Sequence, residues 1–291
     1  MCIRDRVEKR RVHTESGLEV LFIEDLGDNK WQVLFPASRI KDTQVVELPG
    51  QINFKLIKRG IPQHILLSKP IDKDYFKEFG QMALPPYIQK MRGLRTNNES
   101  DEHTYQTDWA QNTGSCAAPT ASLHFNNQDL LELKEKGVKI CKLTLHVGLG
   151  TFLPIREENI LKHQMHSEEV YIPPETIEKL KIAKANNKNI GTLGTTATRA
   201  IESIDKNYFQ TTIDKGLKGS TDLFLYPGKS FNYVNRLMTN FHQPKSTLIA
   251  LVAAFAGLEP VKASYNWAID CLLYTSPSPR DQRGSRMPSS A

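Results

Sequence analysis

The sequence predicts an α/β protein that carries a smaller all-β unit. The first third of the chain is a series of short β-like runs separated by turn residues, whereas the part after Leu84 alternates strands, glycine loops and helices. The composition, with 39% hydrophobic and 24% charged residues among 291, is ordinary for a globular protein. One large domain or two ordinary domains would fit this length.

Five runs carry the β pattern in the first third: LEVLFIED, KWQVLFPAS, QVVELPG, INFKLIKRG and IPQHILLS. The turn residues between them are Gly27-Asp28-Asn29, Pro49-Gly50 and Gly60. Short strands with regular turns predict a small antiparallel barrel or sandwich. We assign it to residues 7–83 and expect no long helix between Leu18 and Leu67.

The remainder, residues 84–270, follows an α/β pattern. NNQDLLELKEKG predicts a helix that Asn126 or Asn127 caps and Gly137 ends. Lys139–Val147 and Asn189–Gly194 predict strands. Further helices are predicted after Pro173-Pro174 and directly after Gly194.

The two ends of the chain differ from the rest. CLLYTSPSPRDQRGSRMPSSA, from Cys271 onward, is rich in Ser, Pro and Arg and has no periodicity. We interpret residues 271–291 and 1–6 as tails that are not native, such as adapter-derived sequence, on a chain truncated at both ends. The tails contribute +2 and +1 to the formal charge of +6, which leaves +3 for residues 7–270. That charge alone does not predict a nucleic-acid partner.

The sequence shows neither a membrane span nor a secretory signal. Its longest mostly apolar run, TLIALVAAFAGL, is shorter than the roughly 20 residues that a spanning helix needs. The four cysteines have no metal-ligand spacing, which favours free thiols in a reducing cytosol. We therefore expect a cytoplasmic protein.

Four polar motifs stand at the ends of predicted elements. LHVGLGTF has Gly148 and Gly150 but no third glycine, so it is not a dinucleotide fingerprint; it favours close backbone approach to a ligand and a tight turn about equally. LGTTATR places hydroxyls and free N–H groups at a helix start, which suits a carboxylate, although plain capping is the commoner role. AAPTASLHF and TNFHQPKST carry Thr120, His124, Asn240 and His242, which suit either a site or a packed core.

KHQMHSEE, from Lys162 to Glu169, has two histidines with the spacing of a metal-ligand pair. It is not H-E-x-x-H, and a zinc site would need a third ligand with its own support. Acid/base or hydrogen-bonding duty is therefore favoured over metal binding for His163 and His166.

Taken together and in this order, the motifs are specific. ALPPYI, YQTDWA, GSCAAPTASLHF, LTLHVGLGTFLPI, HQMHSE, GTTATRAIES, LYPG and TNFHQPKSTLIALVAAFAG resemble the S-adenosylmethionine:tRNA ribosyltransferase-isomerase family of queuosine biosynthesis over residues 7–270. The resemblance implies a barrel-like α/β main domain with an inserted small β-barrel domain.

The resemblance also implies a reaction. The ribosyl group of S-adenosylmethionine is transferred to the aminomethyl-deazaguanine wobble base of tRNA and isomerised, which gives epoxyqueuosine-tRNA, adenine and methionine. S-adenosylmethionine is then a consumed cosubstrate, and no cofactor or metal is expected. The expected partners are tRNA and S-adenosylmethionine, with a monomeric enzyme and no membrane.

The matched motifs supply the candidate site. We expect one cavity to contain His124, His146, His166, Glu168, Arg199, Asn240, His242, Thr120, Gly148, Gly150, Thr195 and Thr196. The candidate catalytic residues are His146, His166, Glu168, His124 and His242. The candidate substrate-binding residues are Tyr105, Gln106, Thr120, Gly148, Gly150, Thr151, Gly194, Thr195, Thr196, Arg199 and Asn240. His146 is the first choice for a general base, and Arg199 is expected to hold a ligand carboxylate, because its permanent charge makes it a poor base.

The sequence departs from the family pattern at Cys116, Ser122, Lys229 and Gln243, and family motifs expected before Val7 and after Asp270 are absent. Two alternatives are kept: a metal-dependent hydrolase that uses His163 and His166, and a binding module without catalysis, which the missing motifs favour. Candidate phosphate contacts for tRNA are Lys9, Arg10, Arg11, Lys229, Arg236 and Lys245.

Overall fold

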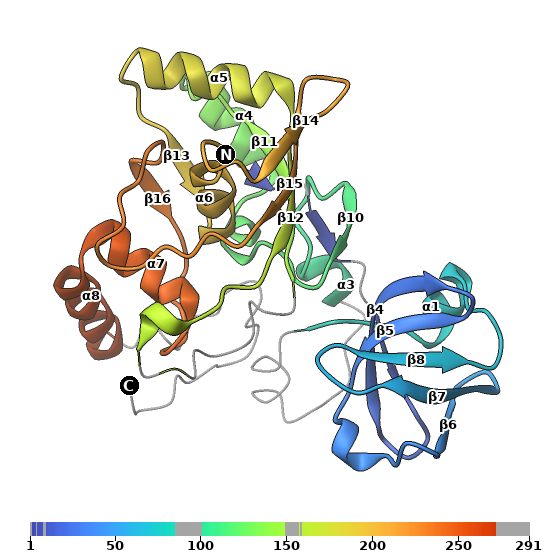
Figure 1. Cartoon of the computed structure of the whole chain (residues 1–291). Coiled ribbons are helices and arrows are strands. Elements are labelled where there is room, and N and C mark those ends of the chain that lie inside the picture. The colour runs from blue at the N-terminus through green and yellow to red at the C-terminus, as the bar shows by residue number, and fades with distance from the viewer. Residues whose placement is uncertain are drawn as a thin grey trace.

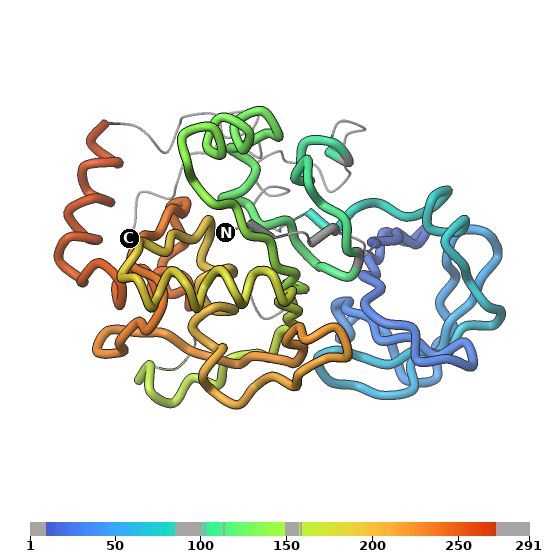
Figure 2. The backbone as a smooth tube through the Cα atoms, turned by 90° about the horizontal axis from the view of Figure 1, so that it is seen from above, coloured from blue at the N-terminus to red at the C-terminus, as the bar shows by residue number. Residues whose placement is uncertain are grey.

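The computed structural model describes residues 2–3, 5–7, 10–84, 101–148, 157 and 159–271. It confirms a mixed helix and sheet architecture. Figure 1 shows a curled sheet from the early part of the chain beside a larger body that contains most of the helices. The same arrangement is visible from above in Figure 2.

The curled sheet has seven strands, and all of its pairs are antiparallel. Alternating side chains such as Val20, Phe22, Phe54 and Ile65 point inward and form its buried core. The strands, in spatial order, are β6 (Val45–Leu48), β7 (Ile52–Lys58), β8 (Gln63–Leu67), β5 (Lys30–Leu34), β4 (Glu19–Gly27), β3 (Arg10–His13) and β9 (Gln81–Met82).

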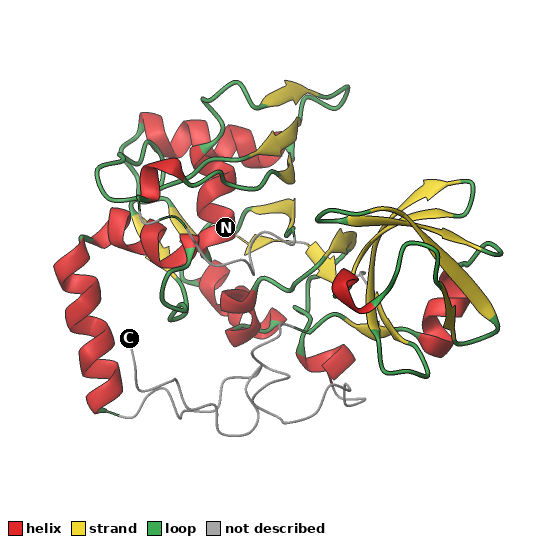
Figure 3. Ribbon diagram, turned by 60° about the horizontal axis from the view of Figure 1, so that its bottom comes forward, coloured by secondary structure: helices red, strands yellow, loops and turns green. Residues whose placement is uncertain are grey.

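The expected absence of a long helix between Leu18 and Leu67 is confirmed, since only the short turn η1 (Ala37–Arg39) interrupts the strands there. The expectation of an all-β unit is wrong in one respect. Helix α1 (Lys73–Phe79) lies within it, and its residues Tyr75 and Phe76 pack against the core. Figure 3 shows a helix, in red, beside the curled sheet. Asp72 caps α1 by accepting hydrogen bonds from two backbone N–H groups, a signal that was present in the sequence.

The sheet is curled, but within residues 10–84 no strand pairing joins β6 to β9, so a closed barrel is not established. The chain enters the sheet through β3 and leaves it through β9, which pair with each other. Arg11 strengthens this junction: its Nη2 donates to the Leu84 carbonyl at 3.1 Å and its Nε lies 2.6 Å from Glu19. The division of the chain at Leu84 into two domains stays a prediction.

The larger body is built on a five-stranded mixed sheet. Its strands, in spatial order, are β1 (Cys2–Ile3), β11 (Lys142–His146), β12 (Glu168–Ile172), β15 (Leu217–Thr221) and β14 (Phe209–Thr211). β1 is parallel to β11, and the other pairs are antiparallel. Leu143, Leu145, Val170 and Ile172 form one buried face, which shares a core with Ala197 and Ile201 of helix α6 (Thr195–Glu202).

Two short pairs of parallel strands complete the sheets. They are β10 (Asn112–Ser115) with β2 (Asp5–Val7), and β13 (Gly191–Leu193) with β16 (Arg236–Met238). Residues 1–6, which were interpreted as a tail, therefore contain β1 and the start of β2, and this pairing was not predicted. Strand pairing uses backbone groups, so composition alone did not reveal it. Of the C-terminal tail, only Cys271 lies within the described residues, and it is exposed.

Six further α-helices are described: α3 (Asp101–Thr104), α4 (Asn127–Glu135), α5 (Pro174–Ala185), α6 (Thr195–Glu202), α7 (Thr247–Ala256) and α8 (Leu258–Asp270). The predicted boundaries of α4 are confirmed, because Asn126 forms a capping box and Gly137 follows the last turn with φ +85°. Pro174 begins α5, as predicted. The short turns η2 (Thr120–His124) and η4 (Ile160–Lys162) lie in connecting segments.

Within the described ranges, no single helix is long and apolar enough to cross a membrane. The helices α7 and α8 pass that test only as a pair, and a bend of 114° separates them.

Candidate functional site

The parallel strands β13 and β16 end side by side, and polar residues follow both. Gly194 donates its N–H to the Met238 carbonyl at 2.8 Å, which ties the two strand ends together. Gly194 has φ +92°, and a Cβ there would lie 3.6 Å from that of Ala121. Glycine therefore allows both the turn and the close approach of η2. In parallel sheets, the carboxyl ends of strands are the usual place for ligands.

Three polar side chains from two distant parts of the chain meet beside this turn. Asn240, two residues after β16, accepts a hydrogen bond from His124: its Oδ1 lies 2.8 Å from His124 Nε2. The Asn240 Nδ2 donates to Thr120 Oγ1 at 3.3 Å. We call Thr120, His124 and Asn240 the amide cluster. It joins η2 to the loop that follows β16.

The amide cluster determines which nitrogen of His124 can act as a base. Because the Asn240 amide nitrogen points to Thr120, its oxygen faces His124, and an oxygen of this kind only accepts. In the neutral ring, His124 Nε2 therefore carries the proton, and Nδ1 is the basic nitrogen. His124 is exposed, so Nδ1 belongs to a side chain that a substrate can reach.

His242 lies close in sequence to the amide cluster but has its own contacts. Its Nε2 is 3.0 Å from Thr239 Oγ1. Its backbone N–H donates to the Tyr265 hydroxyl at 2.6 Å, and that hydroxyl donates to the His242 carbonyl at 3.2 Å. Burial raises the pKa of Tyr265, and the hydrogen bond to His242 partly opposes that rise. Tyr265 of α8 had no local signal in the sequence, because it lies 23 residues from its partner.

The first turn of α6 opens at the same strand ends. Thr195, its first residue, is buried, and Thr196 is half-buried. The backbone N–H groups of this turn begin the helix and give it a partial positive charge. The expected capping by threonine is not seen, since Gly194 is the N-cap and no side chain bonds there.

Glu168 and Arg199 form a second polar group, which we call the buried pair. Arg199 Nη1 donates to Glu168 Oε2, and the Gly148 N–H donates to Glu168 Oε1 at 3.1 Å. Arg199 Nε donates to the Leu223 carbonyl at 3.0 Å. Glu168 and Arg199 are only 4% and 3% exposed, so the carboxylate that Arg199 holds is the protein's own. The expectation that Arg199 binds a ligand carboxylate and that Glu168 is catalytic is not supported by this geometry.

His146 lies on the other face of the sheet from the buried pair. The register of β11 and β12 places His146 opposite Glu169, and neighbouring side chains in a strand alternate between faces, so Glu168 points away from it. The imidazole lies against Gly114, where a Cβ would come within 2.9 Å of Nδ1. The register therefore separates His146 from Glu168, two residues that were expected in one cavity.

The two histidines of KHQMHSEE have different surroundings. His163 Nδ1 lies 3.1 Å from Glu157 Oε2, and its ring meets Phe224 edge to face at 5.3 Å. His166 is exposed and lies two residues before β12. In the part of the chain that the structure describes, no three His, Cys, Asp or Glu side chains are grouped to hold a metal ion.

Several other candidates need correction or fall outside the described ranges. Tyr105 is 2% exposed and packs with Met82 and Leu84, so it is a core residue rather than a ligand contact. Gln106 lies beside it and donates to Met82 Sδ at 3.7 Å. Gly150 and Thr151 lie outside the described residues.

The candidate phosphate contacts differ in how exposed they are. Arg11 is 5% exposed, so the prediction that it contacts tRNA was wrong. Burial lowers the pKa of its guanidinium, and the charge of Glu19 opposes that effect. Lys229, Arg236 and Lys245 are exposed, and Arg10 is half-buried. Lys9 lies outside the described residues.

Comparisons with known proteins agree on one family. A family model described as queuosine biosynthesis protein matches residues 2–273. The S-adenosylmethionine:tRNA ribosyltransferase-isomerase of Sulfurihydrogenibium sp. (strain YO3AOP1) is 40% identical over 267 residues, which are 91% of this chain and 76% of that protein. The protein of the same name from Thermosipho melanesiensis is 39% identical over 260 residues, 89% of this chain and 74% of its own.

A solved structure is also similar. The S-adenosylmethionine tRNA ribosyltransferase of Thermotoga maritima is 26% identical to this chain, with a TM-score of 0.42. The similarity covers 92% of this chain and 75% of that one.

Proposed function

The chain belongs to the queuosine biosynthesis protein family, and we propose that it is an S-adenosylmethionine:tRNA ribosyltransferase-isomerase. The proposed reaction moves the ribosyl group of S-adenosylmethionine onto the aminomethyl-deazaguanine wobble base of tRNA and isomerises it. Epoxyqueuosine-tRNA, adenine and methionine are the products. The names of the curated relatives support the reaction class. In this proposal S-adenosylmethionine is a consumed cosubstrate, tRNA is the partner, and the enzyme is a monomer.

The structural observation that supports catalysis is the amide cluster at the ends of β13 and β16. The reaction needs a proton to leave the carbon next to the sulfonium, another to leave the substrate ammonium, and one to reach the departing adenine. Histidine suits such transfers because it titrates near neutral pH. His124 is exposed and is oriented by Asn240 through a 2.8 Å contact. We therefore assign His124 to one of these proton transfers, with Nδ1 as the reacting nitrogen.

The first turn of α6 is the proposed site for the carboxylate of S-adenosylmethionine. Gly194 begins the helix next to Ala121 of η2, within the segment that holds Thr120 and His124. A helix N-terminus offers unpaired N–H groups and a partial positive charge, which suit an anion. Arg199 is not needed for this role, because its donors are directed to Glu168 and backbone carbonyls.

His146 remains a proposed general base, from the sequence motif rather than from the amide cluster. His146→Ala should retain binding of S-adenosylmethionine and tRNA but lower the rate by roughly 10²-fold or more, the usual scale for a positioned acid or base. Single-turnover rates with saturating substrates measure this effect. A rate within a few-fold of the unaltered protein would remove His146 from the reaction.

Release of adenine tests the function directly. The protein is incubated with S-adenosylmethionine labelled in the adenine ring and tRNA that carries the precursor base, and free adenine is measured. Release that depends on that tRNA supports the proposal. Binding of both substrates without release would indicate a binding module instead. Activity that appears only when a divalent metal is added would favour the metal-dependent alternative.

A further inference from the structure

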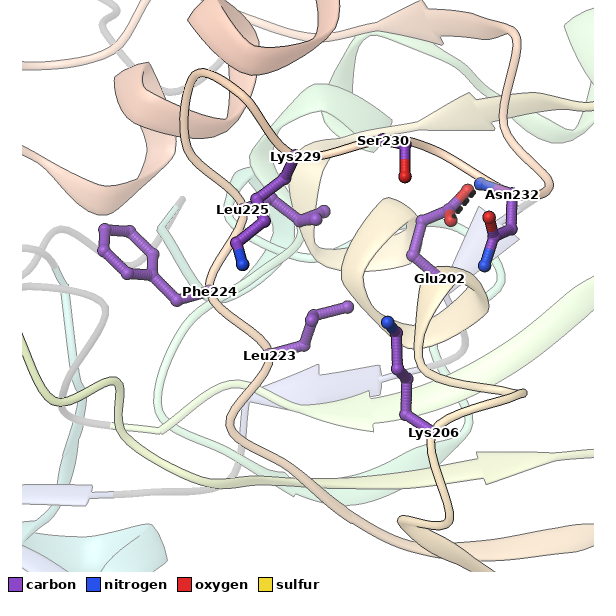
Figure 4. Close-up of a pocket in the computed structure, with 8 residues that line it drawn as sticks. All are labelled: Glu202, Lys206, Leu223, Phe224, Leu225, Lys229, Ser230 and Asn232. Atoms are coloured by element: carbon purple, nitrogen blue, oxygen red, sulfur yellow. Dashed lines mark hydrogen bonds between the residues drawn. The ribbon is translucent and has the colours of Figure 1, made fainter. Parts of the chain in front are cut away.

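A pocket of about 130 Å³ opens at the far end of α6 from the Gly194 turn. Glu202, the last residue of α6, and Lys206 form one side, and residues of the loop after β15 form the other (Figure 4). This loop contains the motif LYPG, to which the proposed reaction assigns no role. Ser230 and Asn232 add polar groups to the lining.

The cations of this pocket are available to a ligand. Lys206 and Lys229 are both exposed, and among the described residues neither has a carboxylate within 4.0 Å. The nearby acid Asp205 is engaged elsewhere, because it accepts a hydrogen bond from Tyr233 and pairs with Lys184. Lysine ammonium groups in this situation are typical partners of phosphate oxygens.

Glu202 is the one acid in the lining, and its oxygens are already occupied. It accepts hydrogen bonds from the backbone N–H groups of Asn232, Tyr233 and Val234 at 2.7, 3.0 and 2.8 Å. The first of these bonds is drawn in Figure 4. Three of the roughly four acceptor sites of a carboxylate are thus used to hold the loop against α6. By formal charge, two lysines outweigh this single carboxylate.

An aromatic surface adjoins the lysines. The Lys229 ammonium lies 5.0 Å from the centre of the Tyr226 ring, and the Tyr226 and Phe224 rings are 5.2 Å apart. Both rings are half-buried, so part of each remains accessible. Cations next to aromatic faces are the combination with which proteins bind single-stranded nucleic acid, since phosphates meet the cations and bases stack on the rings.

We infer that this pocket binds a backbone phosphate of the tRNA, at a nucleotide next to the one that reacts. The inference rests on the proposed function. Helix α6 has eight residues, so the pocket lies about 12 Å from the Gly194 turn by helix rise. A nucleic-acid strand extends over such a distance, so a tRNA held in the pocket can also reach the amide cluster beside that turn. The C-terminal end of a helix by itself disfavours anions, so phosphate binding here depends on the two lysines.

The experiment measures tRNA affinity as a function of salt concentration. Three proteins are compared: the unaltered chain, Lys206→Ala/Lys229→Ala, and a control with the same charge change on α5, Lys179→Ala/Lys181→Ala. Each lysine that contacts a phosphate contributes about one to the slope of log affinity against log salt. The pocket variant should weaken binding at low salt and reduce the slope by about two, whereas the α5 control should change it by less than half as much.

A charge-preserving variant separates charge from folding. Lys206→Arg/Lys229→Arg should keep most of the affinity and the slope, because arginine also binds phosphate. A pocket variant that binds tRNA with the unaltered slope overturns the inference, and so does an α5 control that loses as much. The adenine-release assay on the unaltered chain decides the proposed function separately. A chain that releases adenine while the pocket variant keeps its slope would refute the pocket alone.

Discussion

The buried pair and the amide cluster are both polar groups that the sequence motifs placed in one site, yet they differ in what their atoms can still do. In the buried pair, Arg199 directs Nε, Nη1 and Nη2 to protein acceptors, and both side chains are nearly inaccessible. In the amide cluster, His124 is exposed and its Nδ1 is not the nitrogen that meets Asn240.

The difference teaches that polarity at the end of a strand does not by itself indicate catalysis. A group whose hydrogen-bonding capacity is used within the protein stabilises the fold and positions the backbone. A group that keeps a reactive atom accessible can act on a substrate. The buried pair should therefore respond to substitution mainly in stability, and the amide cluster mainly in rate.

The largest expected effect is on the buried pair. Arg199→Met removes one partner and leaves the Glu168 charge buried, so the free energy of unfolding should fall by about 3–5 kcal/mol. Urea denaturation measures the change. Lys184→Ala is the matched control, because it removes the exposed pair with Asp205 and should cost less than about 1 kcal/mol. Equal losses in the two variants would contradict the assigned structural role.

The next effect is on the rate. His124→Ala should lower adenine release by roughly 10²-fold, because it removes a positioned proton acceptor, while the free energy of unfolding should change by less than about 1 kcal/mol. His103→Ala, at an exposed histidine of α3, serves as the control and should leave the rate unchanged. If His124→Ala lost stability and rate together, the two clusters would not differ as proposed.

A smaller effect is expected where His146 meets Gly114. Gly114→Ala would place a Cβ 2.9 Å from the His146 ring. The free energy of unfolding should therefore fall by about 1–3 kcal/mol in addition to the loss that the positive φ of residue 114 causes in any residue with a Cβ. Gly137→Ala is the control, since Gly137 also has a positive φ but nothing lies within 4 Å of its Cβ position. It should lose only about 1–2 kcal/mol. Similar losses at both glycines would show that the ring moves aside freely.

The smallest effect concerns Tyr265 and depends on pH. Burial raises its pKa in the folded state, so above the ordinary tyrosine value of about 10 the unfolded state ionises first and holds fewer protons. The contribution of Tyr265 to stability is thus complete below pH about 10 and is lost as the pH rises. Tyr265→Phe should make the fall of unfolding free energy between about pH 9 and 11.5 shallower. Part of this pH dependence should remain in the variant, because other tyrosines, such as Tyr75 and Tyr233, also have raised pKa values. An unchanged slope would show that Tyr265 does not contribute to the pH dependence of stability.

Local features of the fold could be predicted from the sequence because neighbouring residues determine them. Asn126 with Asp129 forms a capping box from residues three apart, and Gly194 allows the positive φ that begins α6. The helices α4, α5 and α6 and the strands β11 and β13 were predicted from such signals and from apolar periodicity. Five strands of the seven-stranded sheet followed from their turns, whereas β3, β9 and α1 were missed.

The arrangement of the site could not be predicted, because it depends on pairing between distant residues. Asn240 meets Thr120 across 120 residues of sequence, and Arg199 meets Glu168 across 31. Strand register decides which face a side chain occupies, and a shift of one residue reverses it. That is why His146 and Glu168 were assigned to one cavity although the pairing of β11 with β12 places them on opposite faces.

The pairing of β3 with β9 makes the curled sheet a candidate for transplantation. Arg10 lies opposite Met82, so the two points at which the chain crosses into and out of residues 10–82 are neighbours. Insertions are tolerated where their ends lie close together, since the host then has to bridge only a short gap. A loop of a few glycines and serines could replace the whole unit, and the unit itself could be spliced into a surface turn of an unrelated protein.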